Sequence, residues 1–272
     1  MFFLSELSLL QKLTYADSKD VLYNHRQRNS SCFGMKLLLI QLLTQGCPST
    51  RDRSYLMKYI LQRLIANMPA ALYRYALILV STGQCANAVI QLNRAIIRGH
   101  LPSRALMSQM MIQGREGVAK DRNRAFELVE EGARLGCHHC QGVMAMCYKD
   151  GYGIRRDEAL SLELARESSG KGSRYGKFAL GRLYRYGGEV AEDYAQTVAL
   201  YRLAAAQNLD DAQYGLGFMY YYGYSVVKDH AEALRLCQLA ATQGHPEALK
   251  WVAHCHERGR GGVRQNKAEA IL

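Results

Sequence analysis

Residues that interrupt helices and patterns that mark strands are both scarce in this sequence. Only 4 of the 272 residues are proline, and no alternation of Val, Ile and Thr persists for six residues. The longest strand-like run is the pair Val226-Val227. Since proline breaks helix interiors and alternation marks half-buried strands, the composition predicts helices joined by glycine-containing turns and argues against a β-rich fold.

The pattern of a targeting or membrane-spanning segment is also missing. The apolar run Leu37–Leu43 is far shorter than the roughly 20 residues that a helix needs to cross a bilayer. The apolar start, Met1–Leu13, is interrupted by Glu6 and has no basic residue before it, the reverse of a secretory signal. Acidic residues precede the first arginine, Arg26, which disfavours a mitochondrial transit sequence without excluding that compartment. We therefore expect an intracellular protein, in the cytoplasm by preference.

Positive charge is abundant but never concentrated. Lys and Arg number 35 against 24 Asp and Glu, which gives a net charge of +11 and a pI of about 9.3. These cations are spread from Lys12 to Lys267, and no block of five or six occurs. A solvated, mildly basic surface accounts for this pattern. A groove for nucleic acid is the alternative, because a phosphate backbone selects for such charge.

Glycine, in contrast to proline, recurs at a fixed period. Successive members of one series are separated by 37, 36, 36 and 36 residues, and a second series that includes one asparagine keeps the same spacings. The first series is Gly114, Gly151, Gly187, Gly223 and Gly259, and the second is Gly99, Gly136, Gly172, Asn208 and Gly244. Two phased series indicate a repeated unit that contains two turns.

Columns of matched side chains lie at fixed offsets from the second series. Four and nine residues after each marker the side chain is small, eight after it is Met, Leu or Val, and twelve after it is most often Tyr. Eleven residues before each marker stand Ala88, Ala125, Ser161, Thr197 and Ala233. Offsets 4, 8, 11, 12 and 15 fall within about a third of a helix circumference. Small residues on that face allow two helices to approach closely, while larger ones fill the gaps.

Each unit is therefore predicted to contain helix A, a glycine turn, helix B and a second turn. Glycine supplies the left-handed backbone conformation that ends a helix. One such hairpin cannot bury its apolar faces alone, so neighbouring units must stack. The expected fold class is all-α, an α/α superhelical solenoid of helix-turn-helix repeats of about 36 residues.

This pattern resembles the Sel-1-like repeat, a relative of the tetratricopeptide repeat. The match is best in Ala212, Leu216-Gly217, Tyr220, Gly223, Asp229, Ala233, Ala240-Ala241 and Gly244-His245. Units that begin near Ala105, Gln141 and Gly176 fit nearly as well, and the resemblance covers about residues 67 to 272. It implies a right-handed superhelix and a protein that binds other proteins without catalysing a reaction.

The predicted organisation is an irregular N-terminal helical cap over residues 1–50 followed by a solenoid over residues 51–272. Within the solenoid we expect a degenerate repeat at 67–99, full repeats at 100–136, 137–172, 173–208 and 209–244, and an incomplete repeat at 245–272. The last repeat stops at Leu272 inside its helix B. We expect its exposed apolar face to be covered by a partner, by a self-contact or by a longer chain.

No group of residues has the arrangement of a catalytic or cofactor site. Cys137-His138-His139-Cys140 has metal-ligand spacing, but no second CxxC would complete a tetrahedral site, and the cluster coincides with a repeat turn. The glycine-rich segment Gly259–Val263 lacks the GK[ST] ending of a phosphate loop. Eight cysteines are too few for a disulfide scaffold, and only Cys237 and Cys255 lie on helices that would let them approach. We expect no catalytic residue, no cofactor and no metal.

A binding face is predicted on helix A, on the side opposite the packed one. Offsets 6, 10 and 13 of the later repeats carry aromatic and arginine side chains, which often anchor interfaces. The candidate groove residues are Phe178, Arg182, Arg185, Tyr214, Phe218, Tyr221, Lys250 and His254. The alternative is that superhelical curvature buries Phe178 and Phe218 against a neighbouring repeat.

The sequence thus predicts a non-enzymatic scaffold or adaptor that binds a segment of a partner protein along the concave groove, with no small-molecule substrate. A basic helical-repeat protein that binds RNA is the second hypothesis. The net charge of +11 supports it, and the strong glycine and Ala-Ala columns oppose it. A metal- or redox-active cysteine protein is the third hypothesis.

Overall fold

The structure is a computed structural model that describes residues 68–258, and every regular element in this range is an α-helix. Its helices are α4 (Pro69–Ser81), α5 (Cys85–Ile97), α6 (Leu101–Gln113), α7 (Arg122–Arg134), α8 (His138–Asp150), α9 (Glu158–Gly170), α10 (Arg174–Tyr186), α11 (Tyr194–Ala205), α12 (Asp210–Tyr222), α13 (His230–Thr242) and α14 (Pro246–Arg258). The predicted all-α class is confirmed.

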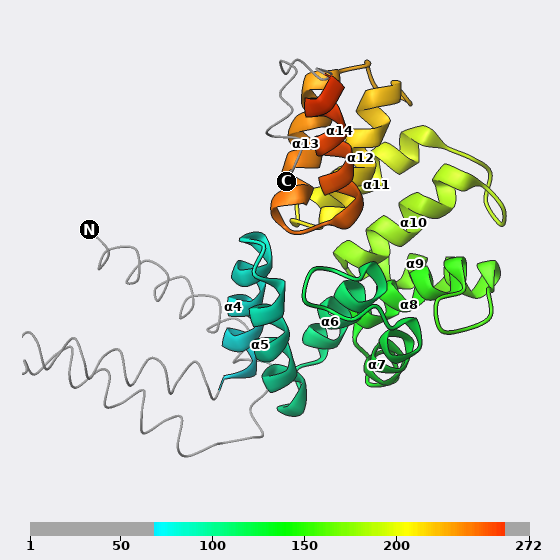
Figure 1. The fold of residues 1–272 in the computed structure, drawn as a ribbon. Helices are drawn as coiled ribbons and strands as arrows, with labels where there is room; N and C mark the ends of the chain where they lie inside the picture. The colour runs from blue at the N-terminus through cyan, green and yellow to red at the C-terminus, as the bar shows by residue number, and fades with distance from the viewer. Residues whose placement is uncertain (1–67, 259–272) are drawn as a thin grey trace, which may run out of the picture. The chain divides into compact units, whose positions relative to one another are not determined.

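The chain divides into two compact units, Met1–Leu72 and Tyr73–Leu272. The predicted cap over residues 1–50 and the predicted last helix B, after residue 258, lie outside the described residues. In the second unit, α6, α8, α10, α12 and α14 are the A helices of successive repeats, and α7, α9, α11 and α13 are the B helices. Figure 1 shows these helices following one another as stacked hairpins, as the repeat predicts.

Two kinds of turn alternate along the stack, and both use a left-handed residue. After the A helices, Gly114, Gly151 and Gly223 end α6, α8 and α12 in this conformation. After the B helices the second glycine series has positive φ throughout, and Asn208 takes its place with a φ of 58°. Asparagine tolerates this region better than most residues with a Cβ, which explains the single exception in the series.

Helix B begins at an aspartate in four successive repeats. The side chain of each accepts a hydrogen bond from the backbone N–H three residues later, which satisfies a donor that the helix itself leaves unpaired. These N-caps are Asp121, Asp157, Asp193 and Asp229. Their negative charge also lies at the positive end of the helix dipole. The 36-residue spacing of the aspartates therefore fixes the start of each helix B.

Helices A and B of one repeat meet at two of the predicted columns of small residues. One column lies nine residues after a glycine marker, and the other lies eleven residues before the next marker. In three repeats a hydroxyl from one helix donates to a backbone carbonyl of the other across this contact. The bonds run from Ser108 to Ala125 (2.6 Å), from Ser161 to Ala145 (2.7 Å) and from Thr197 to Gly181 (3.1 Å). In the next repeat, a Cβ on Gly217 would lie 3.0 Å from the carbonyl oxygen of Ala233. Small side chains therefore set the distance between the helices, as predicted.

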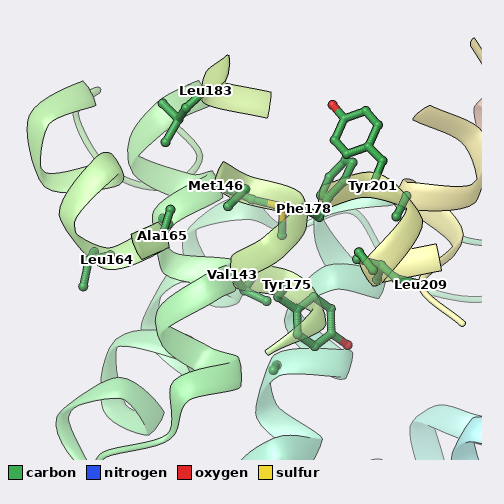
Figure 2. Close-up of a cluster of buried hydrophobic side chains, with 14 of the residues drawn as sticks. Val143, Met146, Leu164, Ala165, Tyr175, Phe178, Leu183, Tyr201 and Leu209 are labelled. Carbon is green, nitrogen blue, oxygen red and sulfur yellow. The ribbon is translucent and has the colours of Figure 1, made fainter. Parts of the chain in front are cut away.

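The apolar core runs between the hairpins. Tyr175, Leu183, Tyr201 and Leu209 are almost completely buried in a cluster that extends from α6 to α13. Figure 2 shows these side chains together, with Tyr201 beside Phe178. A smaller cluster joins α4, α5 and α6 through Ala76, Leu92 and Met110, among others. Each hairpin is thus covered by its neighbours.

A buried polar cluster holds the start of α12 against the end of α6, although these helices belong to repeats that are not neighbours in sequence. Arg115 and Asp210 are each 2% exposed and form an ion pair. Arg115 also donates to the carbonyl oxygen of Gln243 at 2.9 Å. From α6, Gln109 donates to Asp210 at 2.8 Å and Gln113 donates to Asp211 at 2.9 Å. We call these residues, with His245, the inner polar cluster.

Within this cluster Asp211 is held in its ionised form. Burial alone would raise the pKa of Asp211, but the hydrogen bond with His245 and the amide of Gln113 lower it to about 2. His245 Nε2 lies 3.1 Å from the Asp211 carboxylate, and His245 Nδ1 accepts the backbone N–H of Ala248 at 3.1 Å. The acidic start of α12 also faces the positive end of its own helix dipole. The buried charges are therefore compensated on several sides.

Substitution of Gly142 with alanine tests the close approach of the helices. The new Cβ would lie 2.4 Å from the backbone nitrogen of Gly176, which cannot move without shifting α10. We expect Gly142→Ala to lower the free energy of unfolding by about 1–3 kcal/mol or more, because overpacking strains a close-packed core. Gly170→Ala is the control, since a Cβ there meets nothing within 4 Å. Equal urea midpoints for the two variants would contradict the expectation.

Removal of Arg115 tests the inner polar cluster. Arg115→Met leaves Asp210 buried without its cation, and we expect a loss of about 3–5 kcal/mol in the free energy of unfolding. Arg124→Met removes an arginine from the exposed pair with Glu127 and should cost less than about 1 kcal/mol. Urea denaturation followed by circular dichroism compares the two. Similar losses in both variants would show that the buried pair contributes no more than a surface pair.

Candidate interaction surface

Two of the predicted groove residues form part of the packing between repeats. Phe178 is 8% exposed, and its ring centroid lies 5.2 Å from that of Tyr201 (Figure 2). Arg182 forms two hydrogen bonds with the Asp150 carboxylate, at 2.6 and 3.0 Å, and so ties α10 to the end of α8. Phe178 is therefore buried against a neighbouring repeat, as the alternative interpretation of the sequence has it, whereas Phe218 is only partly buried.

Arg185 lies nearer the surface, between aromatic rings. Its guanidinium carbon is 4.3 Å from the ring centroid of Phe218 and 4.9 Å from that of Tyr186. Burial raises the pKa of Tyr201 to about 12, and the nearby charges of Arg182 and Arg185 act against this rise. Within the described part of the chain, no carboxylate forms an ion pair with Arg185. Its positive charge is therefore held in place by rings, without a neutralising carboxylate among residues 68–258.

The rings around Arg185 continue as a ladder across the ends of α10 and α12. Phe218 lies 4.4 Å from Tyr222, and Tyr222 lies 5.6 Å from Tyr224. Tyr224 stacks on Tyr194 at 4.8 Å with an interplanar angle of 12°. Tyr186 and Tyr222 are 56% and 51% exposed. We call the set Arg185, Tyr186, Tyr194, Phe218, Tyr222 and Tyr224 the aromatic–arginine surface.

The remaining predicted residues lie on α12 and α14. Tyr214 stacks on His245 at 5.0 Å and so joins the inner polar cluster. Tyr221 packs edge to face against Trp251 at 5.5 Å, which connects α12 to α14. Lys250 and His254 are exposed on α14, and each lies near a glutamate of its own helix. The eight predicted residues thus divide into packing residues, members of the aromatic–arginine surface and an exposed polar face of α14.

Four members of the aromatic–arginine surface were not among the predicted residues. Tyr186 and Tyr222 are the last residues of α10 and α12, and they lie 36 residues apart. That shared position is a signal that the sequence contains. Tyr194 lies on a B helix and Tyr224 in a turn, so helix A periodicity could not identify them.

The cysteine–histidine cluster lies at the start of α8. Cys137 is the N-cap residue and Cys140 the third residue of the helix, and both are buried. His139 Nδ1 lies 3.0 Å from the Ser173 hydroxyl. Among residues 68–258, no three His, Cys, Asp or Glu side chains are placed to hold a metal ion. The disulfide considered between Cys237 and Cys255 is not formed, since Cys237 is a free thiol. Burial raises the pKa of Cys237 to about 12.

No helix in the described range is long and apolar enough to cross a membrane.

The stacked hairpins, the left-handed turns and the small-residue contacts define a helical-repeat solenoid. The sequence profile of the Sel1 repeat matches residues 102–137, 138–173, 175–209, 210–245 and 246–272, which together make up more than half of the chain. The chain belongs to the Sel1 repeat family, whose members are in general non-catalytic scaffolds for protein interactions.

Solved structures of similar proteins include three bacterial examples. A Sel1 repeat protein from Oxalobacter formigenes is 23% identical, with 75% of this chain and 85% of that chain covered and a TM-score of 0.47. A Sel1 repeat protein from Klebsiella pneumoniae is 20% identical, with 68% and 92% covered and a TM-score of 0.46. A protective antigen of uropathogenic Escherichia coli, c5321, is 23% identical, with 88% and 52% covered and a TM-score of 0.44. No curated protein matches the chain.

Proposed function

We propose that the chain is a scaffold that binds a segment of a partner protein across the aromatic–arginine surface. The observation that carries this proposal is the combination of two exposed tyrosines, Tyr186 and Tyr222, with an arginine that has no anionic partner in the described range. Aromatic and arginine side chains are the residue types that most often dominate binding energy at protein interfaces. Rings that already contact one another lose little conformational freedom on binding.

The chemistry of the surface favours a particular kind of partner segment. Exposed rings offer flat apolar faces for proline or aromatic side chains. The guanidinium of Arg185 can bind a carboxylate with two parallel hydrogen bonds. We therefore propose an extended acidic segment that also carries proline or aromatic residues. The positive charge of the whole chain would speed its association with such a segment.

The other predicted groove residues have supporting parts in this proposal. Phe178 and Arg182 fix the position of α10, and Tyr214 and Tyr221 fix the position of α12 against its neighbours. Lys250 and His254 would extend the contact along α14.

RNA is the second candidate ligand, because the same surface offers it two favourable contacts. Exposed tyrosine rings can stack on unpaired bases, and arginine can pair with phosphate. The net charge of +11 adds a non-specific attraction. Such binding would weaken steeply as salt increases, whereas a protein partner held mainly by rings would be less sensitive.

An affinity-capture experiment tests the proposal. The wild-type chain and the double variant Arg185→Ala/Tyr222→Ala are immobilised, and proteins captured from a cell lysate, with and without ribonuclease, are quantified by mass spectrometry. We expect at least one protein to be recovered about tenfold less on the variant, since loss of two anchor residues costs on the order of 1–4 kcal/mol.

The control is Arg134→Ala/Leu135→Ala, which removes an arginine and an exposed apolar side chain at the end of α7. Equal melting temperatures would show that all three chains are folded. Recovery of every captured protein to the same extent on both double variants would refute the proposed surface. Captured protein that disappears after ribonuclease treatment would favour the RNA alternative.

A further inference from the structure

At the start of α6, α10 and α14, the residue before helix A is hydrogen-bonded to the third residue of that helix. His100 Nδ1 lies 2.8 Å from the Ser103 hydroxyl at the start of α6. At the corresponding place before α14, His245 Nδ1 accepts the backbone N–H of Ala248. Cys137 and Cys140 occupy these two positions in the α8 repeat. The fold itself therefore brings the two thiols together.

The two thiols differ in acidity. The Cys140 thiol, together with the backbone N–H groups of Cys140 and His139, lowers the pKa of Cys137 to about 7 against the opposing effect of burial. Contact with Cys137 and burial raise the pKa of Cys140. The thiolate form is thus favoured at Cys137, whereas Cys140 is the sulfur that keeps its proton. One reactive and one protonated thiol is the combination that many redox-active cysteine pairs use.

Gly132 of α7 and Arg104 of α6 lie beside Cys140. Gly132 of α7 has no side chain at this point, and a Cβ there would lie 2.4 Å from the Cys140 sulfur. Arg104 binds Glu131 through its terminal nitrogens, but its buried Nε has no hydrogen-bond partner. In the first turn of a helix, these positions have Cα atoms about 5 Å apart, within the range of a disulfide.

We infer that Cys137 and Cys140 are a redox-active dithiol, which hydrogen peroxide converts to an intramolecular disulfide. Cys137 is 5% exposed in the turn before α8, so only a small oxidant can reach its sulfur. Peroxide is close to water in size, and it reacts with the thiolate form of cysteine. The site is independent of the aromatic–arginine surface, and neither proposal depends on the other.

The reaction has two steps. The Cys137 thiolate sulfur attacks one oxygen of the peroxide, the O–O bond breaks, and a hydroxide leaves to give a sulfenic acid. The Cys140 sulfur then attacks the Cys137 sulfur, the S–O bond breaks, and the second hydroxide leaves with the proton of Cys140 as water. The first hydroxide takes up the proton that Cys137 released when it ionised, so two thiols lose two electrons and one peroxide is reduced to two waters.

The experiment exposes the folded full-length chain to hydrogen peroxide at pH 6, 7 and 8, blocks the remaining thiols, and identifies each cysteine by mass spectrometry. We expect a Cys137–Cys140 disulfide that forms at least about tenfold faster than any oxidation of Cys147 or Cys237, and faster as the pH rises through 7. Burial raises the pKa of both reference thiols to about 12, so they have almost no thiolate. Dithiothreitol should reverse the product.

Two variants separate the roles of the two sulfurs. Cys140→Ser should accumulate a Cys137 sulfenic acid that dimedone traps, and Cys137→Ser should leave Cys140 reduced. Serine is also a good N-cap residue, as at Ser173, and Ser103 occupies the third position of α6, so circular dichroism should show both variants folded. The inference is overturned if Cys137 and Cys147 are oxidised at equal rates in the folded chain, or if Cys140→Ser traps no sulfenic acid.

Discussion

The distance between helix backbones is the constraint on which the other features of the fold depend. At Gly142 the next A helix passes so close that a single methyl group would overlap the backbone of Gly176. Within each hairpin a hydroxyl or a glycine occupies the same restricted space, and the hydroxyls use it to bond a carbonyl of the facing helix. Large side chains are thereby confined to the gaps between hairpins. Tyr175 and Tyr201 are almost completely buried in those gaps.

Most of the fold could be predicted from the sequence, but less of the aromatic–arginine surface could be. Turns and small-residue contacts are local, so the phased glycines and the columns at Ser108 and Ala125 predicted them correctly. The pairing of Arg115 with Asp210 is different, because it depends on how far the superhelix turns per repeat, a quantity that no residue pattern records. For the same reason Phe178 is buried, whereas Tyr214, at the equivalent position one repeat later, is only partly buried. The aromatic–arginine surface was only partly predicted, since it combines helix ends with a turn.

The scaffold function proposed for the chain is consistent with how its aromatic–arginine surface is supported. Arg182 is bound by Asp150, Tyr221 is packed on Trp251, and Arg185 lies between two rings. Side chains that are held from behind keep their arrangement in the absence of a ligand, which lowers the entropy that binding must overcome. The dithiol at the start of α8 uses another property of the repeat. The residue before helix A and the third residue of that helix are both cysteine at α8, and we propose that this makes a helix start chemically reactive.

The inner polar cluster has a consequence for the evolution of the chain. Solenoids commonly gain and lose whole repeats, because each unit contacts only its neighbours and the array has no fixed length. Here Arg115 and Asp210 are 95 positions apart and meet as a buried ion pair. Deleting or duplicating one 36-residue unit between them would move Asp210 away from Arg115 and leave two charges buried without partners. The buried ion pair therefore disfavours any change in the number of repeats between these two residues.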